Sequence, residues 1–260
     1  DGPQMLPVSG VTLTHKPIIE RISSGDAHLD ELLGGGYFQG GCSLIAGSSG
    51  TGKTTLLCTF AHAACQRGER VLFISFEESS NSLIFTMGSP GIDLQQHVDA
   101  GHLTIHSSFP EAKGTDQHLI QIMNLIESIR PDHICVDAIS TAQRMGTGHS
   151  AFDFQIRLFY ACKGLGVSCI TSIQSKELDT AREMGHLELS SVAETVVALE
   201  QTHNADSSPR KVTIVKSRGT AHYTGANPFT ISSEGMNFKG NAIPPHAADS
   251  DTPQTKRMAD

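Results

Sequence analysis

The segment Gly47-Ser48-Ser49-Gly50-Thr51-Gly52-Lys53-Thr54 decides the fold of this chain, because it fits the phosphate-loop pattern GxxxxGK[ST]. An apolar run at 42–46 precedes it and a helical pattern begins at Lys53, which is the strand–loop–helix context that the pattern requires. The glycines let the backbone curl so that its N–H groups point at phosphate oxygens, and the helix N-terminus adds a partial positive charge. The residues expected to bind a nucleotide are Ser49, Gly50, Thr51, Gly52, Lys53, Thr54 and Thr55.

Short apolar runs alternate with amphipathic stretches on both sides of this loop. Strands are expected at 42–46, 70–76, 103–106, 133–137 and 167–173, with helices at 53–67, 115–129 and 152–163. A shorter helix is expected around 29–33, ended by the glycines at 34–36. The alternation predicts the α/β class, with a mainly parallel central sheet flanked by helices. The later β-rich runs at 195–199, 212–215 and 229–231 have no helices between them, which predicts an antiparallel extension near the C-terminal end.

We expect one domain, at residues 18–239, with a loose segment at each end. Residues 1–17 carry three prolines without a clear period, which is typical of a linker or N-terminal arm. Residues 240–260 have the composition of a flexible C-terminal tail. Because the first residue is Asp1, we expect a processed chain or an excised piece of a longer one.

The composition of the 260 residues excludes several classes of protein. With 38% hydrophobic and 18% charged residues, global disorder is not indicated. A net charge of −8 and the absence of Trp argue against a general nucleic-acid binder. No apolar run approaches the roughly 18 residues of a membrane span, so no membrane partner is expected. The six cysteines form no CxxC pair and are expected to be reduced core residues of a cytoplasmic protein.

Three residues are candidates for handling the phosphates and their metal ion. Lys53 would reach the β- and γ-phosphates, and the Thr54 hydroxyl would be a ligand of Mg²⁺. The apolar strand 133–137 ends in Asp137, a carboxylate of the kind that holds a magnesium ion beside a phosphate loop. We therefore expect a metal site at Thr54 and Asp137.

Glu77 and Glu78 follow the apolar strand at 70–76. Open α/β sheets bind ligands at the C-terminal ends of their parallel strands, which is where these carboxylates are expected. One of them could take a proton from water or a hydroxyl group as it attacks a γ-phosphate. The alternative is a solvated pair that stabilises the start of the next helix. We favour the catalytic interpretation for at least one of them, with Glu77 preferred.

Two later patterns remain ambiguous on spacing alone. Lys216 and Arg218 would share one face of a strand, because side chains alternate along it, and would by themselves be a solvated basic strand end. Ser190 and Ser191 precede a β-rich run, and Ser191-Val192-Ala193-Glu194 fits a capping box that predicts a short helix. Spacing alone therefore assigns no function to the two serines.

Taken together, these motifs resemble the RecA-type ATPase domain of the KaiC family of cyanobacterial circadian clock proteins and their bacterial relatives. The resemblance runs from about residue 22 to residue 238 and rests on the segments 22–36, 47–54, 76–79, 136–137, 216–222 and 228–231. It implies a RecA-like P-loop fold, ATP and Mg²⁺ as ligands, and a hexameric ring with nucleotide between the subunits. It further implies that Lys216, Arg218 and His222 reach the ATP of the neighbouring subunit.

The family has two tandem copies of this domain, and the stretch 109–140 resembles the second copy, which is an autokinase as well as an ATPase. The resemblance implies phosphorylation of Ser190 and Ser191, which occupy the acceptor positions. It also implies clock or signalling proteins as partners. Three features depart from the second copy. The tract 218–231 is closer to the first copy, and the aromatic residue that stacks on adenine in the second copy, near Pro90, has no counterpart here. The tail after Gly240 differs from the family's regulator-binding segment.

Two other functions stay open at the level of sequence. One is a RecA- or RadA-like motor that couples ATP to DNA, which a salt-dependent titration with single-stranded DNA would detect. The other is a non-enzymic scaffold in which ATP only assembles the ring. Measuring ADP release and phosphate incorporation in one sample separates the scaffold from an ATPase and autokinase.

Overall fold

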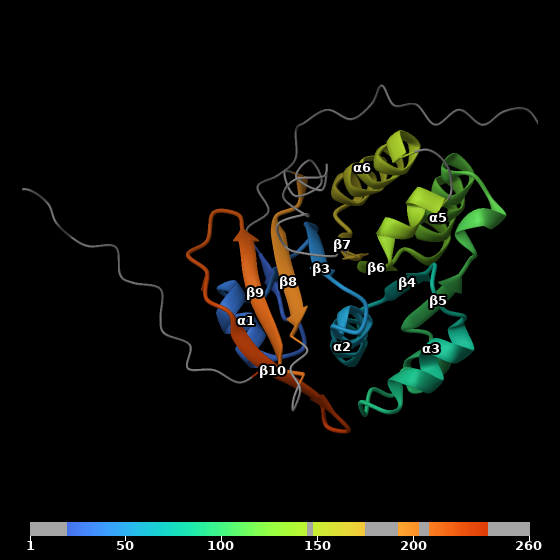
Figure 1. The fold of residues 1–260 in the computed structure, drawn as a ribbon. Helices are drawn as coiled ribbons and strands as arrows, with labels where there is room; N and C mark the ends of the chain where they lie inside the picture. The colour runs from blue at the N-terminus through green and yellow to red at the C-terminus, as the bar shows by residue number, and fades with distance from the viewer. Residues whose placement is uncertain (1–19, 145–147, 175–191, 203–207, 239–260) are drawn as a thin grey trace, which may run out of the picture.

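A nine-stranded sheet with helices on both faces forms the body of the molecule (Figure 1). The computed structural model describes residues 20–144, 148–174, 192–202 and 208–238. The strand order is β11-β10-β9-β8-β3-β7-β6-β4-β5. The strands of this sheet are β3 Cys42–Gly47, β4 Val71–Ser75, β5 Leu103–Ser107, β6 His133–Asp137, β7 Ser168–Gln174, β8 Thr195–Gln201, β9 Arg210–Ser217, β10 Asn227–Ser232 and β11 Gly235–Phe238.

The six strands from β8 to β5 in this order are parallel, and the three beyond β8 are antiparallel. β8 pairs with β3 from Ser43↔Thr195 to Gly47↔Leu199, so both strands end at the same edge of the sheet. β9 runs back along β8, with a bulge between Val196 and Val197. The predicted α/β class, parallel sheet and antiparallel extension are confirmed.

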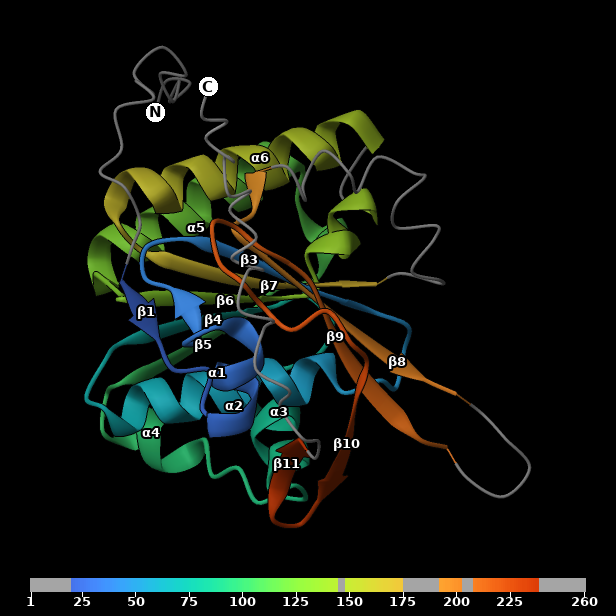
Figure 2. The same ribbon diagram turned by 90° about the vertical axis from the view of Figure 1, so that its left-hand side faces the viewer.

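Helices cover the two faces of the sheet as two separate layers. Figure 2 shows α5 and α6 on one face and α1 to α4 on the other. Each layer buries its own apolar cluster against the sheet, with Phe60 and Phe73 in one and Phe154 and Phe159 in the other. The helices are α1 Ala27–Leu33, α2 Lys53–Gln66, α3 Ser80–Met87, α4 Gln95–Asp99, α5 Thr115–Ile129 and α6 Gly148–Leu165, with 3₁₀ turns at Pro110–Ala112 and Ile139–Arg144.

Capping residues fix the short helix α1 and the ribbon beside it. The Asp26 side chain accepts a hydrogen bond from the Leu29 N–H, and Gly34 ends the helix at φ 75°, a left-handed conformation that suits glycine. The chain then pairs β2 Tyr37–Phe38 with β1 Arg21–Ile22, a small antiparallel ribbon that the sequence patterns did not predict. This ribbon leads directly into β3 and the phosphate loop.

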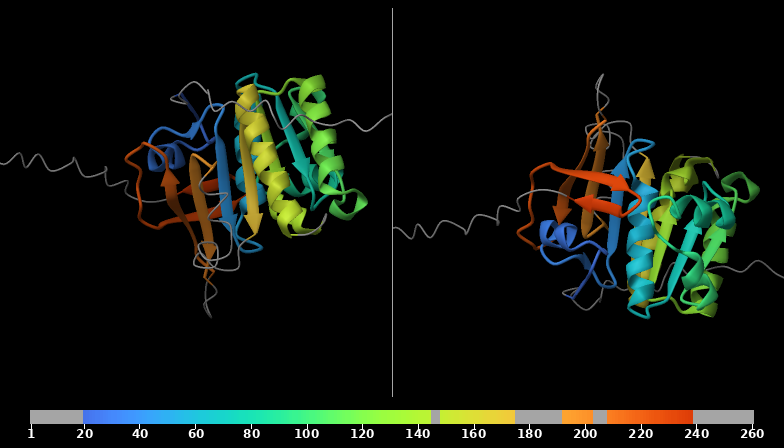
Figure 3. Two further views of the ribbon diagram at one scale, coloured as in Figure 1. Left: turned by 90° about the horizontal axis from the view of Figure 1, so that it is seen from above. Right: turned by 90° about the horizontal axis from the view of Figure 1, so that it is seen from below.

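Different elements form the two opposite sides of the molecule (Figure 3). The antiparallel strands β9 and β10 form one side, while β4, β5 and α5 form the opposite side.

All six cysteines are buried free thiols, as expected, and burial raises the pKa of Cys65 to about 11. Within the described part of the chain, no helix combines the length and apolarity needed to cross a membrane.

Candidate functional site

The phosphate loop leaves the buried strand β3 at Gly47 and enters α2 at Lys53. Gly50 and Gly52 have φ angles of 80° and 102°, which are conformations that L side chains rarely adopt. A Cβ atom on Gly52 would lie 2.7 Å from Cδ1 of Ile231 in β10, so a larger residue there would also displace this side chain. The Thr51 hydroxyl donates to the Ser48 carbonyl oxygen at 2.9 Å, which holds the curl of the loop.

Lys53 lies inside this curl. Its Nζ atom donates to the carbonyl oxygen of Ser48 at 2.8 Å. Burial lowers the pKa of Lys53, and the negative charges of Asp137 and Glu77 oppose that shift. The ammonium group is therefore partly removed from water, and two carboxylates lie near enough to act on its charge.

A buried carboxylate faces the start of α2. Asp137, at the end of β6, accepts a 2.6 Å hydrogen bond from the Thr54 hydroxyl and a short one from the Ser172 hydroxyl. Burial raises the pKa of Asp137, while these hydrogen bonds and the Lys53 charge lower it. The structure thus brings together the two predicted metal-site residues, and their hydroxyl and carboxylate oxygens are donors that Mg²⁺ accepts.

The two glutamates after β4 have different surroundings. The Glu78 N–H donates to the Ser75 hydroxyl, and its carboxylate accepts from the Ser82 hydroxyl at 2.9 Å. Glu78 therefore bonds to the first turn of α3, as the alternative interpretation of the pair proposed. Glu77 is exposed, and its charge acts on the Lys53 ammonium.

The late basic residues lie at the other edge of the sheet. β9 begins beside the phosphate loop, where Arg210 pairs with Gln201, and ends where Ser217 pairs with Thr195. Thr195 and the loop-side residue Leu199 are four positions apart on β8, about 13 Å along a strand. Lys216 and Arg218 are thus separated from the phosphate loop of their own chain.

Several contacts fix the segment that carries these cations. The Ser217 hydroxyl donates to the Leu33 carbonyl oxygen at 3.2 Å, and the Tyr223 N–H donates to the Leu32 carbonyl oxygen at 3.1 Å. Arg21 donates to the Thr220 hydroxyl, and a ring nitrogen of His222 lies 3.1 Å from the Thr220 carbonyl oxygen. The segment is therefore docked on α1 and on the β1–β2 ribbon.

The capping box expected at 191–194 is wrong. Ala193 and Glu194 lie outside any helix, and the Glu194 carboxylate accepts from the Cys42 N–H at 2.8 Å and from Lys163 at 2.7 Å. A carboxylate bound in this way is not available to cap a helix. Ser190 and Ser191 lie outside the described residues, so their predicted phosphorylation stays a prediction.

Sequence patterns missed three residues that the site or its surroundings use. Ser172 orients Asp137, Arg210 donates to the Gly50 carbonyl oxygen at 3.4 Å, and Glu194 holds the start of β8. A hydroxyl group in the apolar strand β7 was the signal for Ser172. Arg210 gave no local signal, and the local pattern at Glu194 indicated a helix cap instead, because each residue acts on a segment more than 150 positions away.

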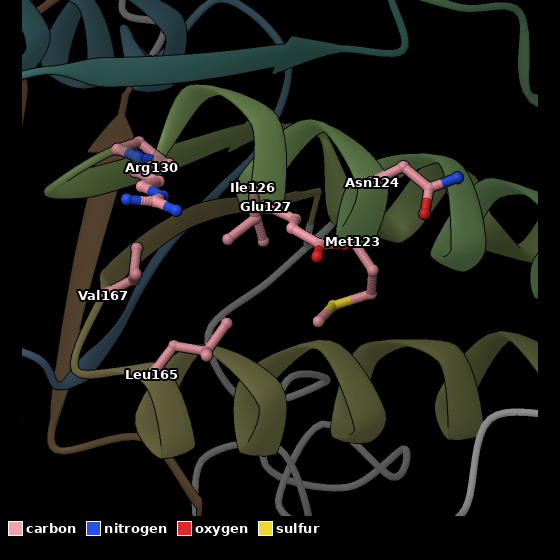
Figure 4. A pocket seen from close by; sticks show the side chains of 8 residues that line it. Met123, Asn124, Ile126, Glu127, Arg130, Leu165 and Val167 are labelled. Atoms are coloured by element: carbon pink, nitrogen blue, oxygen red, sulfur yellow. The ribbon is translucent and has the colours of Figure 1, made fainter.

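A hollow between α5 and α6 is distinct from this site (Figure 4). Its volume is about 540 Å³, and Met123, Ile126, Leu165 and Val167 supply apolar lining. Val167 directly precedes β7, so the hollow lies at the edge of the sheet away from Asp137 and the phosphate loop. None of the predicted site residues lines it.

A phosphate loop between a buried strand and a helix, with a buried carboxylate at the end of a nearby parallel strand, defines a P-loop nucleotide-binding domain. A family model described as "ATPase: KaiC" matches residues 22–242, and the chain belongs to that family.

Curated relatives agree with this assignment. The chain is 30% identical to the circadian clock oscillator protein KaiC of Picosynechococcus sp., over 92% of this chain and 46% of that protein. It is also 30% identical to the circadian clock protein KaiC2 of a Synechocystis strain, over 92% of this chain and 42% of that protein. The chain spans about half the length of the curated relatives it matches.

Proposed function

We propose that the domain binds Mg·ATP at its phosphate loop and hydrolyses it at the interface between adjacent subunits of a hexameric ring. The observation that carries this proposal is the division of the site residues between two edges of the sheet. Lys53, Thr54 and Asp137 lie at one edge, and Lys216 and Arg218 at the other. A single chain cannot close both sets around one nucleotide, whereas head-to-tail packing of identical chains can.

Binding is assigned to the loop. The backbone from Ser49 to Thr55 would surround the phosphates, and Lys53 would bind the β- and γ-phosphate oxygens. Thr54 and Asp137 would hold Mg²⁺, which supplies charge neutralisation at the phosphates when bound. Ser172 would keep the Asp137 carboxylate turned toward Thr54.

Hydrolysis is assigned to Glu77 as general base. Glu77 would take the proton of a water molecule as the water oxygen bonds to the γ-phosphorus atom and the bond to the bridging oxygen of ADP breaks. Its proximity to Lys53 supports this role. The hydrogen bond from Ser82 supports a positioning role for Glu78, through the start of α3.

The neighbouring subunit would complete the site with Lys216, Arg218 and His222. A guanidinium group matches the charge that develops on a transferring phosphoryl group. The Arg218 side chain is 60% exposed, which supports contact with a second chain.

We also propose autophosphorylation of Ser190 and Ser191. Residues 192–194 follow these serines and lie beside Lys216 and Arg218, at the edge away from the phosphate loop of the same chain. The position of this following segment supports transfer to the serines from the ATP of a neighbouring subunit. In each transfer the serine oxygen would bond to the γ-phosphorus atom, ADP would leave, and Glu77 would accept the hydroxyl proton.

The wider setting is inferred from the relatives. Proteins named as circadian clock proteins share this domain, so we propose a role in circadian-type timing or related signalling in the cytoplasm. The expected partners are further copies of the chain and regulatory proteins, without a membrane or nucleic acid.

One sample with Mg·[γ-³²P]ATP tests these activities together. We expect ADP release and labelled Ser190 or Ser191 in the parent protein, and neither in Lys53→Ala, whose loop lacks the ammonium that binds the phosphates. Assembly without ADP release would favour a non-enzymic scaffold. ADP release that requires single-stranded DNA would favour a DNA-coupled motor, and release without serine label would leave an ATPase alone.

A further inference from the structure

Glu194 is a buried acidic residue for which the nucleotide chemistry has no direct use. It lies just before β8, and its side chain is 8% exposed. Its carboxylate accepts hydrogen bonds from the Cys42 N–H at 2.8 Å and from the Lys163 Nζ atom at 2.7 Å. Burying this charge is strongly unfavourable without such partners, so its position calls for a functional explanation.

The same residue holds the strand end that carries Lys216 and Arg218. The Arg218 N–H donates to the Glu194 carbonyl oxygen at 2.8 Å, and the Arg218 guanidinium lies 3.7 Å from the Glu194 carboxylate. Lys216 Nζ donates to the carbonyl oxygen of Ala193 at 2.7 Å. Both cations are therefore fixed against two consecutive residues.

Lys163 connects Glu194 and its neighbours to the rest of the domain. It extends from the last turn of α6, where its side chain is 9% exposed, and donates to the Val192 carbonyl oxygen as well as to Glu194. Cys42, the other partner of Glu194, is the first residue of the strand that ends in the phosphate loop. Glu194 thus connects the start of β3 and the end of α6 to the end of β9.

We infer that Glu194, paired with Lys163, is a positioning residue that orients Arg218 and Lys216 toward the nucleotide of the adjacent subunit. This inference rests on the proposed function. One side of the guanidinium faces the Glu194 carboxylate, while most of the side chain remains exposed. A guanidinium restrained in this way has less conformational freedom to lose when it meets a phosphate group.

Glu194→Gln tests the inference, because the amide keeps the shape and the oxygen acceptor for Cys42 but removes the charge that faces Arg218. We expect ATP turnover in rings of this variant to fall about ten- to hundredfold, the usual cost of a displaced catalytic group. Turnover should recover on mixing with Lys53→Ala subunits, which supply an intact Arg218 and Glu194. Mixing with Arg218→Ala subunits should give no recovery, because both variants then lack the same half of the site.

Two further variants control for folding. The double variant Lys163→Met, Glu194→Gln leaves no unpaired buried charge, and it should show the same loss and the same recovery. Glu69→Gln alters another acidic residue, which pairs with Arg67 and His133, and it should keep the parental turnover. Thermal unfolding of each variant reports on its stability independently.

The outcomes separate this inference from the proposed function. Parental turnover in Glu194→Gln would overturn the inference. Lost turnover that Lys53→Ala subunits fail to restore would also overturn it, provided that they restore Arg218→Ala rings, and would make Glu194 a structural residue. If Lys53→Ala subunits restore neither Glu194→Gln rings nor Arg218→Ala rings, the site shared between subunits is itself contradicted. The positioning role of Glu194 is then contradicted with it.

Discussion

The two adjacent carboxylates after β4 differ in their partners, and this difference is open to a direct test. The Glu78 carboxylate is bound by the Ser82 hydroxyl and its charge acts on Asp137, whereas the charge of Glu77 acts on Lys53. We expect Glu77→Gln to lower kcat by about 10²- to 10⁴-fold with little change in KM, since the amide cannot accept a proton. Glu78→Gln is the matched control and should retain most of the turnover. Steady-state kinetics that show the larger loss in Glu78→Gln would reverse the assignment.

The ionised Asp137 carboxylate destabilises the folded state of the nucleotide-free protein, because burial raises its pKa. A carboxyl group whose pKa is raised on folding destabilises the folded state at neutral pH, and this cost disappears as the pH falls below the unfolded value. Asp137→Asn should therefore melt a few °C higher than the parent at pH 7, and the gap should close toward a pH of about 4.

Asp137→Asn should also impair nucleotide binding, because it removes a proposed ligand of Mg²⁺. We therefore expect the ATP affinity of this variant to depend less on magnesium than that of the parent. Asp116→Asn, on the exposed surface of α5, should change neither property. A parental melting temperature at every pH would contradict the burial cost assigned to Asp137.

The sequence predicted the residues whose roles depend on local spacing. Lys53 and Thr54 belong to one contiguous loop, and Asp137 ends an apolar strand, so each pattern could be seen within a few positions. Ser172 and Glu194 act through contacts between strands that are distant in the sequence. Glu194 was even assigned to a helix cap, because a capping box describes four residues and ignores the burial that tertiary packing imposes.

At the level of elements, the turn at the end of α1 supports the segment that carries Arg218. Gly34 has a φ of 75°, and a Cβ atom there would lie 2.4 Å from the Thr220 Cγ2 atom. We expect Gly34→Ala to lower the free energy of unfolding by more than the cost of a left-handed Ala, about 1 kcal/mol. It should also lower ATP turnover, because Thr220 must move.

Gly68 provides the matched control for this prediction. It follows α2 with a φ of 83°, and a Cβ atom there would meet nothing within 4 Å. Gly68→Ala should therefore lower the free energy of unfolding only by the cost of a left-handed Ala, and it should keep the parental turnover. Equal losses of stability in chemical denaturation and equal turnover in the two variants would show that the contact with Thr220 is unimportant.

Elements with a distinct hydrophobic pattern were easier to predict than elements without one. The amphipathic period of residues 115–129 and the apolar run of residues 133–137 gave the bounds of α5 and β6 as the structure has them. The helices α3 and α4 and the strands β1, β2 and β11 were missed. Each has eight residues or fewer and no pattern as distinct as the apolar run of β6, so tertiary contacts decide its structure.

For the whole molecule, an interface-bound nucleotide predicts assembly that depends on ATP. A ligand that binds only the assembled state stabilises that state by mass action. Light scattering should therefore report hexamers with Mg·ATP and smaller species after its removal. Identical sizes with and without nucleotide would count against binding between subunits.

The central claim is that one subunit supplies the phosphate loop and its neighbour supplies Arg218. Lys53→Ala and Arg218→Ala subunits, each inactive alone, are mixed in equal amounts, and ADP release is measured in rings shown to contain both. Random mixing leaves about a quarter of the interfaces with an intact loop facing an intact arginine, so about a quarter of the parental turnover should return. If Arg218 serves its own loop, every site in the mixed rings lacks one group, and turnover that stays at the level of the separate variants would contradict the account.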